Sequence, residues 1–152
     1  MKRIVWDDSH SVGVDEIDQQ HKDFFRIMNR LQLLQERGAP RELTINVLFE
    51  LYKYADYHFA SEENFMALIK CPHLDNQKRN HQEILKSLQE KVRTFNSNAL
   101  LLEPLLESIA TQFLNHADHA DKLIGNFVRK ISETKTDPFP EPPTGPQGAS
   151  AA

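Results

Sequence analysis

The chain has 152 residues, of which 39% are hydrophobic and 26% charged, and its formal net charge is −4. This length suits one domain with a substantial core, and the composition is that of a soluble globular protein. Acidic and basic residues are interspersed, so no basic patch predicts binding to nucleic acid or to an anionic membrane. The single cysteine, Cys71, excludes an intramolecular disulfide. No apolar run approaches the roughly 20 residues of a membrane span, and the N-terminus does not read as a secretory signal, so we expect a cytoplasmic protein.

Four amphipathic helical segments are expected after an irregular N-terminal arm, residues 1–17, which carries Trp6. Asp18 is a suitable N-cap for the first segment, and breakers containing Pro40 and Pro72 separate the next ones. Short connections favour antiparallel neighbours, so the sequence predicts an all-α, up-down-up-down four-helix bundle. The expected helices cover approximately residues 18–37, 41–70, 74–96 and 101–132.

The last part of the sequence has a different composition. Residues 134–152 are rich in proline, glycine, alanine and serine, and they carry too few apolar side chains to form a core. We therefore expect a folded domain over residues 1–133 and a disordered C-terminal tail over residues 134–152.

Hydrophilic side chains interrupt the apolar stripe of every expected helix. The last stripe, for example, runs through Phe113, His116, Ala120 and Leu123, with Asp121 at its edge. With antiparallel helices that rise about 1.5 Å per residue, all of these hydrophilic groups fall in the same half of the bundle and can converge. They are His21, His58, Glu62, Gln77, His81, His116 and Asp121.

Each of these residues also has an ordinary structural interpretation. One buried histidine is more often a hydrogen-bonded core residue than a ligand, His58 and Glu62 could pair within their helix, and Asp121 could be a surface charge. Taken together, four histidines and two acids in one half of a small core would be costly to desolvate without a partner. Bound cations would remove that cost, so the pattern favours a pair of divalent ions bridged by the two acids.

Several segments resemble the hemerythrin family, in particular its stand-alone bacterial members. The matching pieces are the Gln-His-Lys element at residues 20–22, His58 with Glu62, a proline-led turn before His81, and His116 followed five residues later by Asp121. The resemblance covers roughly residues 5–131. It implies a four-helix bundle with a non-haem di-iron centre that has carboxylate and oxo or hydroxo bridges and binds dioxygen at the open position of one iron.

The resemblance also implies a role for each matching residue. His21 and His58 would ligate the iron with the open position, His81 and His116 the other iron, and Glu62 and Asp121 would bridge the two. The family pattern expects a further histidine four residues before His81, where this chain has Gln77. Because an amide oxygen is a weaker donor than imidazole, we expect the second iron to be held less tightly or to keep a further open position.

Smaller departures from the family pattern lie nearby. Gln112 stands where an aromatic residue is usual and Ala117 where a larger apolar residue is usual, so we expect a roomier or wetter pocket that favours autoxidation. Three further histidines lie off the stripes and are expected at the surface, and Cys71 at a turn is expected to be at most an exposed thiol. The three histidines are His10, His73 and His119.

The sequence is compatible with three functions. The first is a non-enzymatic protein that binds dioxygen or a related small oxidant for carriage, buffering or sensing, with a separate protein partner in the case of a sensor. The second is a redox enzyme that acts on peroxide, nitric oxide or ferrous iron, which Gln77 would favour. The third is a degenerate bundle that binds one metal or none. A ferritin-like oxidase is disfavoured because the chain lacks its paired Glu-x-x-His motifs.

Overall fold

The structure is a computed structural model that describes residues 1–97 and 101–134, and within these ranges it contains helices and no strands. A short 3-10 helix, Asp8–His10, lies in the N-terminal arm. The long helices, in chain order, are α1 (Asp15–Glu36), α2 (Arg41–Leu68), α3 (Leu74–Ser97), α4 (Leu102–His116) and α5 (Lys122–Glu133), and a π-helical turn, Ala117–Asp121, joins α4 to α5.

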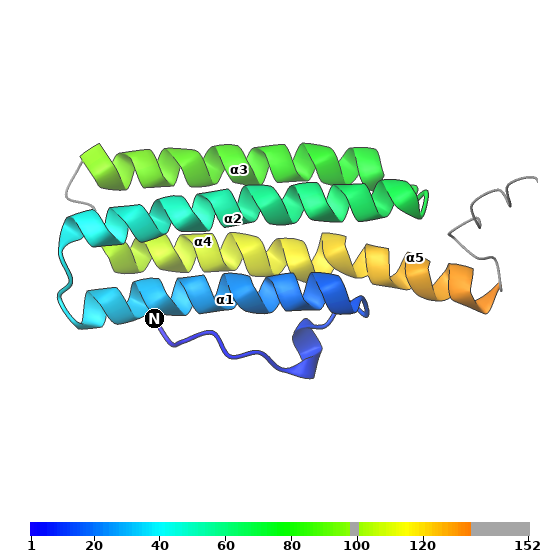
Figure 1. The fold of residues 1–152 in the computed structure, drawn as a ribbon, viewed down its shortest axis with the longest axis horizontal. Coiled ribbons are helices and arrows are strands. Elements are labelled where there is room, and N and C mark those ends of the chain that lie inside the picture. The colour runs from blue at the N-terminus through cyan, green and yellow to red at the C-terminus, as the bar shows by residue number, and fades with distance from the viewer. Residues whose placement is uncertain (98–100, 135–152) are drawn as a thin grey trace, which may run out of the picture.

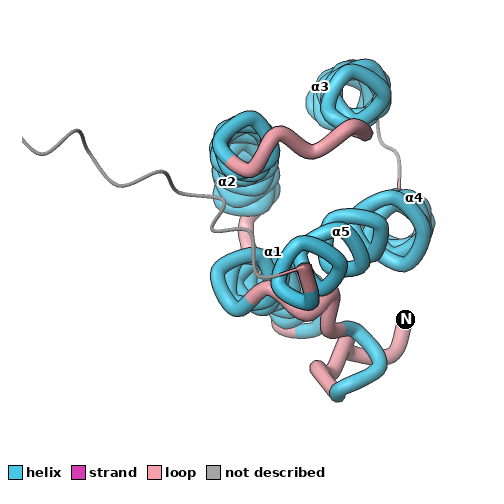
Figure 2. The backbone as a smooth tube through the Cα atoms, turned by 90° about the vertical axis from the view of Figure 1, so that its right-hand side faces the viewer, coloured by secondary structure: helices cyan, strands magenta, loops and turns pink. Residues whose placement is uncertain are grey.

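The helices form an antiparallel four-helix bundle in which α4 and α5 together make the fourth member (Figure 1). Seen end-on, α1 to α4 occupy the four corners of the bundle, and α5 departs from the line of α4 (Figure 2). The predicted all-α bundle is therefore confirmed. Within the described ranges, no helix combines the length and the apolar character needed to cross a membrane. The predicted disordered tail lies outside the described residues, apart from Thr134 at the end of α5.

Helix α1 begins three residues earlier than predicted, so Asp18 does not cap it. Val14 occupies the N-cap position, and Asp18 lies in the first turn of the helix. Its carboxylate accepts hydrogen bonds from the Val12 backbone N–H at 2.8 Å and from the Ser11 hydroxyl at 2.5 Å. Asp18 therefore connects the arm to the first turn of the helix, a role that the local capping pattern does not predict.

Two apolar clusters fill the core on either side of the hydrophilic residues. The larger cluster includes Phe24, Leu51 and Phe113, and the smaller includes Ile17 and Ile124. Cys71 belongs to the smaller cluster and is only 5% exposed, so the expectation of an exposed thiol was wrong. The turn after α2 folds back over the end of the core, and burial there raises the pKa of the Cys71 thiol.

The π-helical turn changes which residues of the fourth helix face inward. Leu123 was predicted on the apolar stripe but is 40% exposed, whereas Asp121, predicted at its edge, is completely buried together with Ile124. In a regular α-helix, residues five apart lie about 140° apart around the axis. A π turn adds a residue to one turn, which brings positions five apart to the same face. His116 and Asp121 therefore both face the core.

The N-terminal arm packs along the bundle rather than projecting from it (Figure 1). Ile4 exchanges two backbone–side-chain hydrogen bonds with Asn29, and the Trp6 ring packs against Phe25 at 5.8 Å between centroids. His10 contacts both of these rings and is half-buried, so its predicted surface position is only partly correct. Of the other two histidines expected at the surface, His119 is exposed and His73 is half-buried.

The contact between the arm and α5 can be tested at Gly125. A Cβ atom added there would lie 1.5 Å from the Val12 carbonyl oxygen, and Val12 is fixed by its hydrogen bond to Asp18. We expect Gly125→Ala to lower the free energy of unfolding, measured by urea denaturation, by about 1–2 kcal/mol, because the overlap outweighs the gain in helix propensity. Lys130→Ala, at an exposed position of the same helix, should change it by less than about 0.5 kcal/mol. Wild-type stability in Gly125→Ala would mean that the arm moves aside freely.

Candidate metal centre

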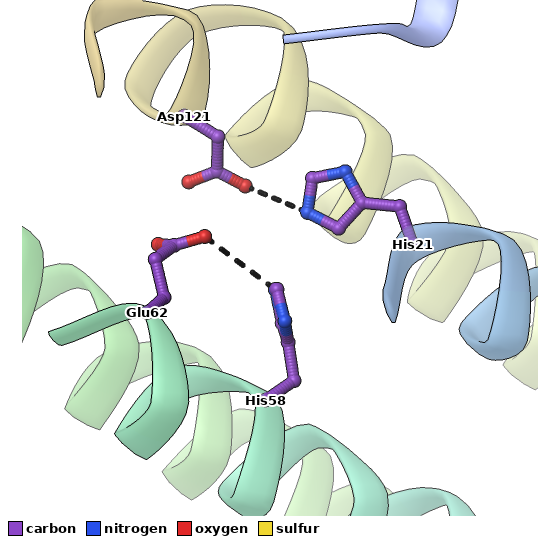
Figure 3. A group of neighbouring side chains, drawn as sticks. All are labelled: His21, His58, Glu62 and Asp121. Carbon is purple, nitrogen blue, oxygen red and sulfur yellow. Dashed lines mark ion pairs between the residues drawn. The ribbon is translucent and has the colours of Figure 1, made fainter. Parts of the chain in front are cut away.

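A first group of metal-capable side chains converges from three parts of the bundle. His21 comes from α1, His58 and Glu62 from α2, and Asp121 from the end of the π-helical turn (Figure 3). One potential ligand atom from each of these residues lies within 4.8 Å of the others. The four side chains point toward a common centre, as expected of a site for a single cation.

A second group adjoins the first and shares both of its acids. It consists of Glu62, His81, His116 and Asp121, and its potential ligand atoms again lie within 4.8 Å of one another. The structure therefore brings together the six predicted histidine and carboxylate ligands in two adjacent groups of four. The shared residues, Glu62 and Asp121, are the ones expected to bridge.

Each of the two carboxylates has one oxygen close to each of the two groups. Asp121 places Oδ2 at 3.1 Å from the His21 ring and Oδ1 at 2.9 Å from the His116 ring. Glu62 places Oε2 at 3.6 Å from the His58 ring and Oε1 at 3.1 Å from the His81 ring. All of these distances are to the histidine Nε2 atoms. One oxygen of each acid thus faces each group, which is the arrangement of a bridging carboxylate.

Burial of these residues leaves polar atoms without hydrogen-bond partners. The side chains of Glu62 and Asp121 are at most 1% exposed, and every histidine of the two groups is at most 8% exposed. Four buried atoms have no hydrogen-bond partner within residues 1–97 and 101–134, namely Nε2 of His21, Nε2 of His58, Oε2 of Glu62 and Oδ2 of Asp121. All of them belong to the first group. A bound cation would coordinate these atoms and offset the cost of their burial, so the donor set fits a metal.

Burial also alters the acid–base properties of the groups. It raises the pKa of Glu62 well above its usual range, and the neighbouring charge of Asp121 adds to this effect. Burial acts in the same direction on Asp121, but the adjacent His116 and His21 rings outweigh it and hold the pKa of Asp121 well below its usual value. Burial lowers the pKa of His58 to about 3, so its ring is neutral at pH 7 and free to act as a ligand.

Gln77 lies at the second group, as its position in the sequence predicted. It is 2% exposed, and its amide nitrogen donates to Oδ1 of Asp121 at 2.9 Å and to Oε1 of Glu62 at 3.3 Å. These are the two carboxylate oxygens that face the second group. The amide oxygen of Gln77 has no hydrogen-bond partner in the part of the chain that the structure describes. The residue therefore contacts both acids, and its role as a metal ligand stays a prediction.

Two residues that orient the histidines were not singled out from the sequence. The Nδ1 atom of His58 lies 2.7 Å from the side-chain oxygen of Gln20, and the Nδ1 atom of His81 lies 2.8 Å from a carboxylate oxygen of Glu63. Since Nδ1–H donates to these oxygens, each ring presents Nε2 to the centre. One indication of this role was present in the sequence, since Gln20 directly precedes His21 and Glu63 directly follows Glu62 in the chain.

Aromatic rings cover the histidines from the larger apolar cluster. Phe59 stacks on His81 at 4.0 Å between ring centroids, and Phe113 meets His21 edge-on at 5.2 Å. Phe24 stacks in turn on Phe113 at 3.8 Å. These contacts fix the ring planes and give the centre an apolar wall on the side of the larger cluster.

Comparison with known proteins agrees with this geometry. The family described as "Hemerythrin HHE cation binding domain" matches residues 12–128. Similar proteins include the bacteriohemerythrin of Campylobacter jejuni, which is 37% identical over 126 residues and is matched over 81% of this chain and 94% of its own length. The bacteriohemerythrin of Clostridium acetobutylicum is 28% identical over 128 residues, with 78% and 96% of the two chains covered. That of Pseudomonas aeruginosa is 27% identical over 138 residues, with 90% of each chain covered.

Metal binding should stabilise the folded chain. Because a cation would bind the converged donors and not the unfolded chain, Zn²⁺ at 100 times its dissociation constant should raise the free energy of unfolding by about 2.7 kcal/mol for each site. Asp121→Asn should lose most of this gain, since one bridging oxygen becomes an amide nitrogen. Asp118→Asn, an exposed acid in the same π-helical turn, serves as the control and should keep it. Denaturant titrations with and without Zn²⁺ measure the difference, and an equal gain in both variants would contradict the assignment.

The orienting contact of Glu63 leads to a second prediction. Glu63→Gln removes the charge that holds Nδ1–H of His81, so we expect the affinity for Zn²⁺ to fall about 10- to 100-fold in competition with a chromophoric chelator. Glu83→Gln makes the same charge change at an exposed position of α3 and should leave the affinity within about twofold. A common loss in both variants would indicate a general charge effect rather than orientation of the ring.

Proposed function

Because the chain belongs to the hemerythrin family, we propose that its two donor groups hold a pair of non-haem iron ions bridged by Glu62 and Asp121. The observation that carries this proposal is the orientation of the two acids, each with one oxygen toward each group. Imidazole and carboxylate donors suit iron, and the neutral His58 ring need lose no proton on binding. His21 and His58 would ligate one iron. The other would be held by His81, His116 and Gln77.

We propose that the centre binds dioxygen or a related small oxidant. Two reduced iron ions can together supply two electrons to dioxygen. With Gln77 assigned to the second ion, the ion of the first group has one donor fewer, so it is the one with free coordination positions for a ligand. Phe59 and Phe113 keep the surroundings apolar, which favours entry of a small uncharged molecule and limits access of water. The protein would then serve in oxygen carriage, buffering or sensing, and a sensor would need a separate protein partner.

A second function is favoured by the side chains at and near the second group. Gln77 replaces an imidazole by a neutral amide, and its nitrogen is the atom directed at the acids in this structure. An amide that does not ligate leaves a further position open on the second iron. Gln112 is half-buried with no aromatic ring at its position, and Ala117 next to His116 is a small buried residue. These features support a redox enzyme that acts on peroxide, nitric oxide or ferrous iron.

One experiment separates these functions. The protein is purified anaerobically, iron is counted per chain, and the charge-transfer absorption is followed while dioxygen is added and withdrawn. Two irons per chain and a band that disappears on deoxygenation support carriage. A band that decays while peroxide is consumed supports the enzyme. Iron at or below one per chain would contradict the di-iron centre and favour a bundle that binds one metal or none.

The role of Gln77 has its own test. Gln77→His supplies an imidazole in place of the amide, so we expect higher iron retention during dialysis against a chelator and slower autoxidation. Gln82→His adds a histidine at an exposed position further along α3 and should change neither quantity. If Gln77→His also leaves both unchanged, residue 77 does not contact the metal.

A further inference from the structure

A groove of about 360 Å³ lies between α2 and α3, and its lining includes Phe49, Tyr52 and Val92. Val92 is buried, Tyr52 is half-buried and Phe49 is 45% exposed, so an apolar surface with aromatic rings is open to solvent here. Lys53 of α2 and Arg93 of α3 also line the groove, and both are exposed. The α2–α3 groove therefore combines an apolar floor with one cation from each helix.

A second groove with an exposed aromatic ring lies between α1 and α2, but its charge has the opposite sign. It is lined by Tyr57 and Leu68, which are 61% and 55% exposed, and by Glu16. Within residues 1–97 and 101–134, no cation contributes to this lining. An acidic segment would be repelled by Glu16 in the second groove and attracted by the cations of the α2–α3 groove. The two grooves thus differ in the charge of the partner that each accepts.

The sequence after α5 contains a segment whose composition is complementary to the α2–α3 groove. Phe139 is the one aromatic residue of residues 135–152, and an acid stands two positions away on either side of it, Asp137 and Glu141. A proline directly precedes and follows Phe139. Proline favours the extended polyproline II conformation, which aromatic-lined grooves recognise at low entropic cost. In that conformation the two acids are about 12 Å apart, more than the roughly 8–10 Å between neighbouring helix axes, so they can flank a ring held between two helices.

The Phe139 ring cannot reach the α2–α3 groove of its own molecule. Helices α2 and α5 finish at the same end of the bundle (Figure 1), and the pair α2 and α3 lies on the side opposite α5 (Figure 2). From Lys53 to the last residue of α2, Leu68, the helix rises about 22 Å. The chain from Thr134 to Phe139 spans at most about 18 Å when fully extended. A contact between Phe139 and this groove therefore joins two copies of the chain.

We propose that residues 137–141 of one copy bind the α2–α3 groove of a second copy, with Phe139 on the apolar floor and the two acids beside Lys53 and Arg93. Each copy carries both the groove and the segment, so the contact is head-to-tail and either closes into a ring or extends into a chain of molecules. The net charge of −4 opposes unspecific association of copies, and the local pairing of opposite charges selects this contact. This self-association goes beyond the proposed function and does not rest on it.

The first test measures self-association of the full chain by sedimentation velocity over a wide range of concentrations. Wild type should form dimers or larger assemblies as its concentration rises, and Phe139→Ala should raise the dissociation constant at least about tenfold, because the ring is the apolar anchor. Gln147→Ala, further along the same segment, is the control and should associate like wild type. A wild type that stays monomeric would overturn the proposal. Unchanged association of Phe139→Ala would do the same, since the bundle surfaces would then pair directly.

The second test exchanges the charges of the groove and the segment. Lys53→Glu with Arg93→Glu reverses the groove, and Asp137→Lys with Glu141→Lys reverses the segment. Each double variant alone should lose self-association at low salt, because like charges then meet. An equimolar mixture of the two should associate again, since every groove then finds a segment of opposite charge. Lys86→Glu, at an exposed position of α3, is the control and should associate like wild type. Self-association of the reversed-groove variant alone, or no association in the mixture, would overturn the proposal.

Discussion

The rest of this structure depends on the burial of two carboxylates, Glu62 and Asp121. Neither is more than 1% exposed, and both lie between the two apolar clusters of the core. An unpaired charge in such a place is strongly destabilising, and here four histidines and one amide surround the two acids. The cluster links all four members of the bundle, so the helices must keep the relative positions that bring these donors together.

The neighbouring residues hold this cluster in a form suited to metal binding. Gln20 and Glu63 accept from Nδ1 of His58 and His81, which turns the opposite ring nitrogen inward. The π-helical turn also positions a ligand, because it brings Asp121 to the face of the helix occupied by His116. Neutral rings and inward nitrogens are the state in which imidazole binds a metal, so little rearrangement is needed on binding.

The surroundings of the cluster differ from one side to the other. Phe59 and Phe113 separate it from an apolar cavity, whereas the smaller cluster of Ile17, Cys71 and Ile124 closes the opposite end of the bundle. The N-terminal arm adds to this closure through Val12, which packs against the backbone of Gly125. Gln112 contributes a polar side chain to the lining of that cavity, which an aromatic residue at its position would not.

The sequence by itself determined the helices, their order and the identity of the metal-capable residues. Helical periodicity specifies which side chains share a face, so the spacing alone pairs His58 with Glu62 and Gln77 with His81. Periodicity failed where the helix is irregular. A regular α-helix would turn Leu123 inward and Asp121 away from His116, and the π turn reverses these two orientations. Likewise, the local capping rule could not show that Asp18 holds the arm.

Only the tertiary structure decided how the helices are placed relative to one another and how their side chains are turned. The alternate orientation of the Glu62 and Asp121 oxygens, the contacts of Gln20 and Glu63 with the histidines, and the burial of Cys71 all depend on that placement. A sequence pattern fixes the direction of a residue about its own helix axis. The offset and rotation between two helices come from packing of the whole core, to which residues distant in the chain contribute.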